Sequence, residues 1–496
     1  MSSGTDKQLT ATPSALLATP QGKAILALLC AVAFVDFVGV SSVNVALPAI
    51  RDDLGFSVQN LQWVLSGYLL TYGGFLLLGG RAADLLGRRR MLVAGTVLFA
   101  VASLAAGLAH NQGTLVAARL AQGVGAAIMS PAGLSLLTTL FAEGSERNKA
   151  IGAWGAMAGL GPAVGVLGGG LLSGGPGWRW IFFVNLPVCG LIVVGAFRLL
   201  APDARPSASM ADFDAPGAGL VTGGMLLLVY ALVRAPGVGW GAVSTIGCLV
   251  GAGVLLGAFL VNEGRNRNPL VPLSIFRIPG LAAANATQVI AMAGFYSMFF
   301  FVTLYMQVVL GYSPIQTGLA YLPVSVGIGF ASAIAVRLMS RAGTRLVIVV
   351  GTLIASGAVY WLSRIPVNGS YPVDLLGPLF VMALGFGLAF VGVQTAANAG
   401  VPADKAGLAA ALINTSYQLG GALGLAIFSA IATAHTQHLL SNHAPGSAAL
   451  TAGFQWGLVA SSISLLGAAL IATRATNVRS EPAPINDPSS LATETQ

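Results

Sequence analysis

The sequence predicts an all-α membrane protein with fourteen transmembrane helices, and three observations support this prediction. Charged residues make up 8% of the 496 residues and hydrophobic residues make up 55%, whereas a soluble domain carries about 25% charged residues. The hydrophobic residues gather in runs that reach the roughly 20 residues a helix needs to cross a bilayer. The polar segments between these runs are short. This composition excludes a soluble globule, and it excludes a disordered chain, which requires low hydrophobicity.

The predicted spans follow one another along nearly the whole chain. The run that begins near Lys23 is too long for the core of a signal peptide, so it is expected to remain as the first span. The 65 glycines fit this prediction because Gly is common in transmembrane helices and lets them pack closely. The expected limits, each to within about four residues, are 24–46, 60–80, 91–109, 115–139, 148–171, 178–199, 216–233, 242–262, 281–307, 316–337, 345–363, 375–399, 406–433 and 449–473.

The basic residues orient the spans, because cytoplasmic loops carry an excess of Lys and Arg. With the N-terminus placed inside, only Arg51, Arg179, Arg234 and Arg364 of the 24 Lys and Arg residues fall in outer segments. Arg119 falls within a span, and all the others fall inside. The predicted topology therefore has an even number of spans and both termini in the cytoplasm.

Two of the predicted inner loops resemble each other. RAADLLGRRR at 81–90 follows the second span, and RLMSRAGTR at 337–345 follows the tenth. The repeat predicts two six-helix halves, an architecture that many secondary transporters share. Spans seven and eight would then be inserted between the halves. Chance similarity of two basic turns is the alternative. The pairs at equal spacing are Arg81 and Arg337, Gly87 and Gly343, Arg89 and Arg345, and Gly95 and Gly351.

No segment between the spans is long enough for a soluble catalytic domain, so the function is expected to lie among the helices. The expected domains are a cytoplasmic tail (1–23), a first six-helix half (24–199), a linker with two inserted helices (200–262), a second six-helix half (263–473) and a cytoplasmic tail (474–496).

Several motifs occur in a fixed order along these spans. The loop after span two contains Gly80, Asp84, Gly87, Arg88 and Arg89. RLAQGVGAA begins at Arg119, and GLGPAVGVLGGG occupies 159–170. WRWIFFVNLP (178–187), QVVLGYSPIQTGLAYLP (307–323) and AGLAAALINTSYQLGGALG (406–424) follow them. Over about residues 24–473 the chain resembles the major facilitator superfamily, in its fourteen-span drug:proton antiporter branch. The resemblance implies the major-facilitator fold. No GxxxxGK[ST] loop is present, so ATP is not the expected energy source.

The first and fifth spans depart from the family pattern. The family's first-span acid would stand at Gly39, before the NVALP at 44–48, but the acid present is Asp36. This places the carboxylate about 4.5 Å nearer the inner surface. In span five, Val166 stands where the family has Pro after a Gly, and Pro162 lies four residues earlier. Whether Asp36 replaces the family's usual acid stays open at this point.

Asp36 and Arg119 are the charged residues expected deep within spans. Asp36 lies about 12 residues, or roughly 18 Å, from the inner end of span one, near the midplane. A carboxylate there must be protonated, paired or in a wet cavity. It is predicted to carry a proton or to counter a cationic substrate, with a packing role as the alternative. Arg119 is predicted to share in proton coupling by offsetting the buried charge of Asp36, with static structural pairing as the alternative.

Two groups of residues are predicted to control conformational change. The resemblance implies that the inner loop after span two latches one conformation, with topology-setting charge as the alternative. Three span-five glycines recur every four residues, so they share a face that another helix can approach closely. The resemblance implies a hinge or seal there, and simple packing is the alternative. The residues assigned to gating are Gly80, Asp84, Gly87, Arg88, Arg89, Gly161, Pro162, Gly165 and Gly169.

Uncharged polar and aromatic side chains in the spans are candidates for the substrate cavity, because drug sites are mostly apolar with a few polar anchors. For each of them, hydrogen bonding between helices is the alternative. The scarcity of acids disfavours strongly cationic substrates. His435, His438 and His443 are interpreted as a solvated loop, so no metal site is predicted. The cavity candidates are Asn44, Tyr68, Gln288, Tyr296, Tyr305, Gln307, Gln394, Asn398, Asn414, Tyr417 and Gln418.

The expected function is secondary active transport that expels hydrophobic drugs or antibiotics across the plasma membrane in exchange for protons. One alternative is an exporter dedicated to one endogenous metabolite or self-made antibiotic, and a remote alternative is a non-transporting membrane sensor or scaffold. An enzyme is not expected, since no nucleophile–base pair or metal cluster falls in the spans. The expected partners are a small hydrophobic substrate, protons and the lipid bilayer, with no nucleic acid and no cofactor. The chain is expected to act as a monomer.

Overall fold

The computed structural model describes residues 16–142, 144–203, 214–266, 269–402 and 405–478. Within these ranges every regular element is helical, and fourteen helical segments are long and apolar enough to cross a bilayer. The predicted fold class and span count are therefore confirmed. Parts of both predicted tails, and residues 204–213 of the predicted linker, lie outside the described residues.

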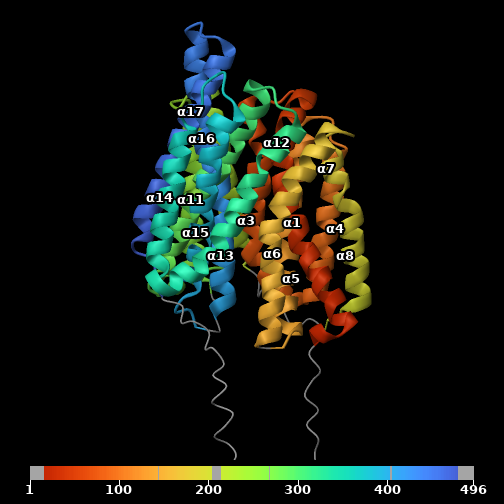
Figure 1. Cartoon of the computed structure of the whole chain (residues 1–496). Coiled ribbons are helices and arrows are strands. Elements are labelled where there is room, and N and C mark those ends of the chain that lie inside the picture. Colours follow the sequence, from red (N-terminus) through yellow and green to blue (C-terminus); the bar gives the residue numbers. More distant parts are fainter. Residues whose placement is uncertain (1–15, 143, 204–213, 267–268, 403–404, 479–496) are drawn as a thin grey trace, which may run out of the picture.

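The first six spans form one bundle, which lies on the right in Figure 1. Two of these spans are broken into a short and a long helix. The elements are α1 (Pro20–Leu54), α2 (Val58–Leu61) with α3 (Trp63–Leu86), α4 (Arg88–Gly107), α5 (Gln112–Leu140), α6 (Ser145–Gly174), and α7 (Trp180–Phe183) with α8 (Asn185–Leu199).

The inserted pair and the second bundle follow. Helices α9 (Ala215–Val238) and α10 (Val243–Arg265) are the inserted spans. The second bundle consists of α11 (Leu281–Leu304) with a π-helical turn (Tyr305–Val309), α12 (Pro314–Ala320) with α13 (Leu322–Ala342), α14 (Thr344–Leu362), a π-helical turn (Tyr371–Leu375) with α15 (Leu376–Asn398), α16 (Ala406–Ser441) and α17 (Gly446–Ala472).

Two helices extend well past their predicted ends. Helix α1 reaches Leu54 rather than residue 46, and α16 reaches Ser441 rather than residue 433. With 35 and 36 residues, each is more than 50 Å long at about 1.5 Å per residue, which exceeds the roughly 30 Å hydrocarbon thickness. The apolar run predicts only part of the helix, which continues through Arg51, Asp52 and Asp53 until Gly55, at φ +69°, ends α1.

Because the number of spans is even, both described chain ends lie at the same end of the bundle (Figure 1). We call this end, where α1 begins and α17 finishes, the proximal end. The opposite end, from which the α16–α17 hairpin projects, is the distal end.

The loop repeat corresponds to a repeat in three dimensions. Gly95 of α4 packs against the backbone of α5, where a Cβ would lie 2.8 Å from the Gly125 oxygen. Gly351 of α14 packs against α15 in the same way, where a Cβ would lie 2.7 Å from the Gly385 oxygen. The corresponding helix pairs of the two halves therefore share one close glycine contact.

The proximal loops of the two halves are also held alike, by the segment that follows the last helix of each half. Asp203 accepts hydrogen bonds from the backbone N–H groups of Arg89 (3.1 Å) and Arg90 (2.8 Å) at the start of α4. Asn477 accepts one from the backbone N–H of Arg345 at the start of α14, at 3.3 Å. Both side chains satisfy free N–H groups of a helix N-terminus, as a capping residue does.

Asp203→Ala is expected to lower the free energy of unfolding by about 1–2 kcal/mol, the usual cost of losing a helix cap. Asn477→Ala is expected to cost less, because it removes a single, longer bond from a neutral side chain. Thermal unfolding midpoints of the detergent-purified protein measure both changes. Equal shifts, or no shift for Asp203→Ala, would contradict a capping role.

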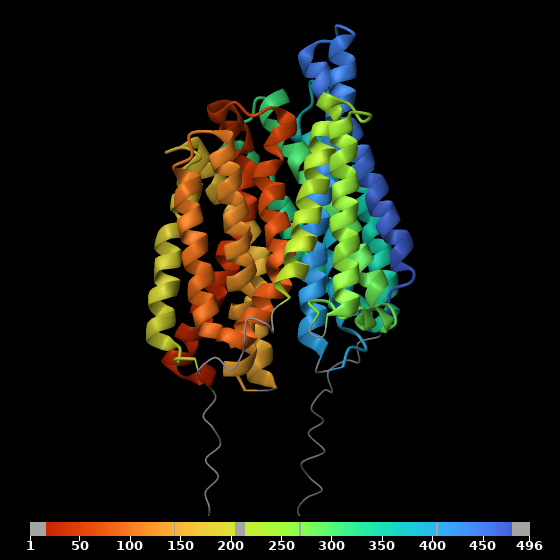
Figure 2. The ribbon, with the colours of Figure 1, turned by 180° about the vertical axis from the view of Figure 1, so that it is seen from behind.

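The two halves meet on opposite faces of the molecule through different elements. On the front, α6 packs against α12 and α13 (Figure 1). On the back, α9 packs against both α3 and α16, and α10 packs outside α9 (Figure 2). The inserted pair therefore covers one side of the interface between the halves.

Candidate functional site

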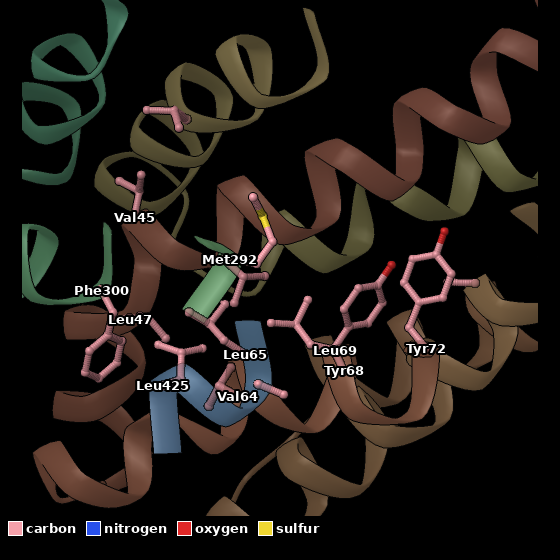
Figure 3. Packing of buried hydrophobic residues seen from close by; sticks show 14 of the residues in the cluster. Val45, Leu47, Val64, Leu65, Tyr68, Leu69, Tyr72, Met292, Phe300 and Leu425 are labelled. Atoms are coloured by element: carbon pink, nitrogen blue, oxygen red, sulfur yellow. The ribbon is translucent and has the colours of Figure 1, made fainter. Parts of the chain in front are cut away.

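Asp36 lies in the middle of α1 and is buried, with 6% of its surface exposed. Its two carboxylate oxygens accept hydrogen bonds from two tyrosines of α3. The Tyr68 hydroxyl donates to one oxygen, and the Tyr72 hydroxyl donates to the other at 2.6 Å. The tyrosines are four residues apart, so they share a helix face, and both point the same way from α3 in Figure 3. A buried carboxylate thus has two polar partners within the apolar core.

Arg119 of α5 is fully buried. Its Nε donates to the carbonyl of Val64 at 2.8 Å, and its Nη1 donates to Oε1 of Gln122 at 2.8 Å. The Gln122 amide donates in turn to the Ser103 hydroxyl of α4 at 2.7 Å. The Nη2 of Arg119 has no hydrogen-bond partner. The guanidinium therefore links α3, α4 and α5 and keeps one donor free.

Tyr68 lies between Asp36 and Arg119. Its hydroxyl donates to Asp36, and the Arg119 guanidinium carbon lies 4.4 Å from the centre of its ring. The ion pairs among the described residues do not include Asp36 with Arg119. The two charges that the sequence places at a similar depth are thus connected through one aromatic side chain.

The second half contributes an aromatic cluster, defined as Phe295 and Tyr296 of α11, Phe386 and Phe390 of α15, and Tyr417 of α16. Phe295 stacks on Phe386 with ring centres 3.7 Å apart. Phe390 packs edge-on against Tyr417, whose hydroxyl accepts from the Tyr296 hydroxyl at 3.2 Å. Three helices therefore present one apolar surface with a pair of hydroxyl groups.

The buried acid of the first half faces this cluster. Tyr296 and Tyr417 are both electrostatic neighbours of Asp36, and Tyr417 is a neighbour of Tyr72. Helices α3 and α16 meet directly at this level, since a Cβ on Gly73 would lie 3.0 Å from the Gln418 Cβ. Asp36 with its tyrosine partners and the aromatic cluster are thus brought together at the interface between the halves.

Three of the predicted cavity residues hold helices together at the distal end. The Asn44 amide donates to Thr303 at 3.1 Å, and the Gln307 amide donates to a backbone carbonyl of α1 at 2.8 Å. Both bonds cross between the halves. Tyr305 donates to the carbonyl of Pro366 at 2.5 Å, which ties it to a distal loop. The contacts of Asn44 and Gln307 join the halves at the distal side of the interface.

The remaining predicted cavity residues differ in how deeply they are buried. Gln288 is 1% exposed within the second half, and Gln418 is 7% exposed against α3. Gln394 is half-buried, whereas Asn398 and Asn414 are exposed, and both asparagines donate to a carbonyl one turn earlier in their own helix. Of the eleven predicted candidates, Tyr68 therefore bonds the buried acid directly, and Tyr296 and Tyr417 belong to the aromatic cluster.

The predicted latch residues lie at the proximal end. Asp84 is exposed and pairs with Arg88 at 3.4 Å, one turn away across the loop. Arg89 lies over the Phe197 ring at 5.0 Å. Gly87 has φ +109°, and a Cβ there would lie 2.5 Å from the Asp203 carboxyl group. Gly80 packs against Pro131, with 3.7 Å from its added Cβ to the Pro131 Cβ. All these contacts are within the first half.

Helix α6 lies beside α1 (Figure 1), and its span-five glycines face α1. An added Cβ would lie 2.5 Å from Phe37 at Gly161, collide with Ser41 at Gly165, and lie 2.7 Å from the backbone of Ser42 at Gly169. Pro162 lies in the same helix. The next face of α6 meets the other half, since a Cβ on Gly170 would lie 2.7 Å from the Pro314 oxygen. Helix α6 is therefore packed closely on both sides.

Gly169→Ala is expected to destabilise the protein by about 1–3 kcal/mol, because the new methyl group meets the backbone of α1 and the helices must separate. The neighbouring Gly168→Ala is the matched control, since an added Cβ there meets nothing within 4 Å. Comparing the thermal unfolding midpoints of the two variants measures the difference. Equal midpoints would show that α6 does not depend on this contact.

Several residues of the site were not predicted. Tyr72, Gln122 and Ser103 complete the hydrogen-bond network, and three phenylalanines form most of the aromatic cluster. The spacing of Tyr68 and Tyr72 is a signal that could have found the second tyrosine. The phenylalanines had no such signal, because Phe is common in every span.

A second pair of buried acids lies away from this site, at the proximal end of the inserted helices. Asp214 and Glu263 are 2% and 3% exposed. Asp214 accepts from the backbone N–H of Gly217 and from the Asn262 amide, both at 2.9 Å, and Glu263 accepts from the backbone N–H of Val271 at 2.7 Å. These bonds join the start of α9 to the end of α10, and join the end of α10 to the chain leading to α11.

Comparison with known proteins gives a consistent family. The profile of the Major Facilitator Superfamily matches residues 29–425. A puromycin resistance protein of Streptomyces alboniger is 39% identical over 86% of this chain and 85% of its own. A cephamycin export protein of Amycolatopsis lactamdurans is 37% identical over 81% and 83%, and a tetracenomycin C resistance and export protein of Streptomyces glaucescens is 34% identical over 84% and 78%.

Solved structures share the fold at low sequence identity. A POT family peptide transporter superposes with a TM-score of 0.66 at 17% identity, covering 94% of this chain and 99% of its own. An inward-facing bacterial homologue of the lysosomal transporter Spinster gives 0.64 at 17%, covering 92% and 96%.

Proposed function

Since the chain belongs to the Major Facilitator Superfamily, we propose that it exports hydrophobic drugs or antibiotics across the plasma membrane in exchange for protons. Members of this family are transporters, and the relatives described above are named for resistance to, or export of, antibiotics. The observation that carries the proposal is the placement of Asp36, a buried acid that faces the aromatic cluster across the interface between the halves.

In this proposal Asp36 is the proton carrier. An ionised carboxylate accepts both tyrosine hydroxyls, whereas a protonated one is itself a donor and cannot keep both bonds unchanged. Tyr68 then shifts over Arg119, and the packing of α1, α3 and α5 changes with it. Burial in an apolar core makes the charged form costly, so the proton and a substrate compete to relieve the same cost.

The aromatic cluster is proposed as the substrate surface. Stacked rings offer a large apolar area with little loss of side-chain entropy, and the paired hydroxyls of Tyr296 and Tyr417 offer polar anchors. Neutral or weakly basic apolar compounds suit this surface, because Asp36 is the single acid among the described buried residues of α1, α3, α11, α15 and α16.

The membrane topology and the conformational state of the transporter are part of the proposal. Both termini are placed in the cytoplasm, so the proximal end faces inward and the distal end faces outward. The distal hydrogen bonds of Asn44 and Gln307 then close the outer side, as an inward-facing state requires. The expected domain limits (1–23, 24–199, 200–262, 263–473 and 474–496), a monomer, and transport without a cofactor remain part of this proposal.

The second candidate is an exporter dedicated to one compound. The relatives above are each named for a single antibiotic, which favours a narrow substrate range. Both candidate functions use the same proton chemistry. They differ in whether the aromatic cluster accepts many apolar compounds or one.

The test is uptake of the lipophilic dye Hoechst 33342, and separately of puromycin, into everted membrane vesicles with and without an imposed acid-inside pH gradient. Uptake of both compounds that requires the gradient supports a multidrug antiporter. Gradient-driven uptake of puromycin alone supports the dedicated exporter. Uptake that is equal with and without the gradient, or no uptake of either compound above that of vesicles lacking the protein, would reject the proposal.

A further inference from the structure

A groove of about 910 Å³ lies between the inserted helices and the first half, outside the proposed substrate path. Its walls come from α5 with Phe56, Asn60 of α2 and Trp63 of α3 on one side, and from α9 and α10 on the other. The inserted pair that carries the second wall lies on the back of the molecule (Figure 2). The volume falls within the roughly 300–1,000 Å³ typical of small-molecule sites. The groove is open to the outside of the protein rather than enclosed.

The groove lies in the distal half of the helices that line it. On α5 it begins at Gln112, the first residue of the helix, and reaches Leu120, eight residues or about 12 Å deeper. On α9 it extends from Arg234 back to Gly223, about 16 Å. These depths match half of a hydrocarbon core that is about 30 Å thick.

Its polarity changes along this depth. The inner walls are aliphatic, with Val116, Leu120, Leu227 and Leu255 among them. The distal mouth is polar and aromatic. Asn60, Gln112, Trp63, Tyr230 and Arg234 line it. Trp and Tyr favour the headgroup level of a membrane, so the groove presents an apolar slot below a polar, positively charged rim.

The charge at the rim is held in place. Arg234 donates to the Tyr230 hydroxyl at 2.5 Å, and its guanidinium carbon lies 5.4 Å from the centre of that ring. The Gln59 side chain donates to the carbonyl of Val233, which fixes the end of α9 against the first half. No acidic side chain lines the groove among the described residues, so the positive charge of Arg234 is not neutralised within it.

We propose that this groove is a binding site for one phospholipid of the distal leaflet with an anionic headgroup. One acyl chain would lie in the aliphatic slot, and the phosphate would accept hydrogen bonds from Arg234 at the rim. The site would lie in the outer leaflet under the topology proposed above, but the inference itself depends only on the position of the groove. A lipid seated there would join the inserted helices to the first half.

The chain offers two matched control positions. Arg364 of the distal end lies over Tyr360, one turn earlier, in the same arrangement as Arg234 over Tyr230, but it does not line the groove. Gly219 lies one turn before Gly223 in α9, and an added Cβ there meets nothing within 4 Å. Gly223 lines the groove, and an added Cβ there meets only Leu255, at 3.9 Å. The Cβ of a larger side chain at Gly223 is therefore accommodated without displacing backbone, at a position that lines the groove.

The experiment titrates the delipidated full-length protein with dioleoyl phosphatidylglycerol or dioleoyl phosphatidylcholine and counts bound lipids by native mass spectrometry. Wild type is expected to bind one phosphatidylglycerol more tightly than phosphatidylcholine. Arg234→Gln is expected to weaken this binding about fivefold, the effect of one arginine near a charged headgroup. Gly223→Leu is expected to abolish the tight site, whereas Arg364→Gln and Gly219→Leu bind as wild type does.

Size-exclusion profiles and thermal midpoints establish that each variant is folded before it is titrated. The proposal is overturned if wild type binds the two lipids equally, or if the two groove variants bind as their controls do. It is also overturned if Gly223→Leu leaves phosphatidylglycerol binding intact and removes dye binding, which would assign the groove to transported compounds.

Discussion

Asp36→Asn is expected to reduce pH-gradient-driven dye uptake in everted vesicles to the level of vesicles without the protein. Asparagine has nearly the shape of aspartate and can still accept a hydrogen bond from Tyr68 or Tyr72, so the fold is expected to persist. It cannot bind or release a proton, so the coupling step is lost. Membrane content and the elution profile of the purified variant show whether it still inserts and folds.

Asp52→Asn is the matched control, because Asp52 lies in the same helix but is exposed at the distal end and pairs with its neighbour Arg51. An exposed pair of this kind contributes little to stability, and the variant is expected to transport as wild type does. Wild-type uptake by Asp36→Asn would move the proton site elsewhere in the chain.

Arg119→Leu is expected to abolish transport and to lower the free energy of unfolding by about 2–5 kcal/mol, because the Val64 carbonyl and the Gln122 side chain lose a buried partner. Arg119→Lys is expected to recover only part of this loss. Lysine keeps the charge near Tyr68, but its ammonium group cannot reproduce the planar geometry of the guanidinium. Unfolding midpoints and vesicle uptake measure the two effects separately.

A double substitution tests whether the two charges act as one unit. If Asp36 and Arg119 are coupled through Tyr68, Asp36→Asn with Arg119→Leu is expected to be no less stable than Arg119→Leu alone. Effects on the unfolding free energy that add to within about 0.5 kcal/mol would argue for independent sites.

Most of the fold could be predicted because a bilayer sets one simple requirement on every span. Runs of about 20 apolar residues identify all fourteen spans, and the alternation of Arg and Lys across them supports the count. The distal extensions of α1 and α16 could not be predicted in this way. Outside the bilayer a helix no longer requires an apolar run, and its end depends on local features such as Gly55.

The candidate site was only partly predictable. Asp36 and Arg119 are visible as charges within apolar runs, but the ring that connects them is not, because tyrosine in a span has many ordinary roles. Asn44 and Gln307 are predicted for the cavity, and the hydrogen bonds that they make between the halves are not visible in the sequence. The aromatic cluster combines residues from α11, α15 and α16, which are far apart in sequence, so only the packing of these helices brings them together.

The central claim, exchange of substrate for protons at Asp36, is tested most directly by proton movement in reconstituted liposomes. Liposomes loaded with a lipophilic dye that has no titratable group are diluted at equal pH, with the voltage held at zero by valinomycin and K⁺. As the dye leaves, a pH indicator in the lumen should report acidification for wild type and none for Asp36→Asn. Dye efflux through wild type without acidification would contradict the account.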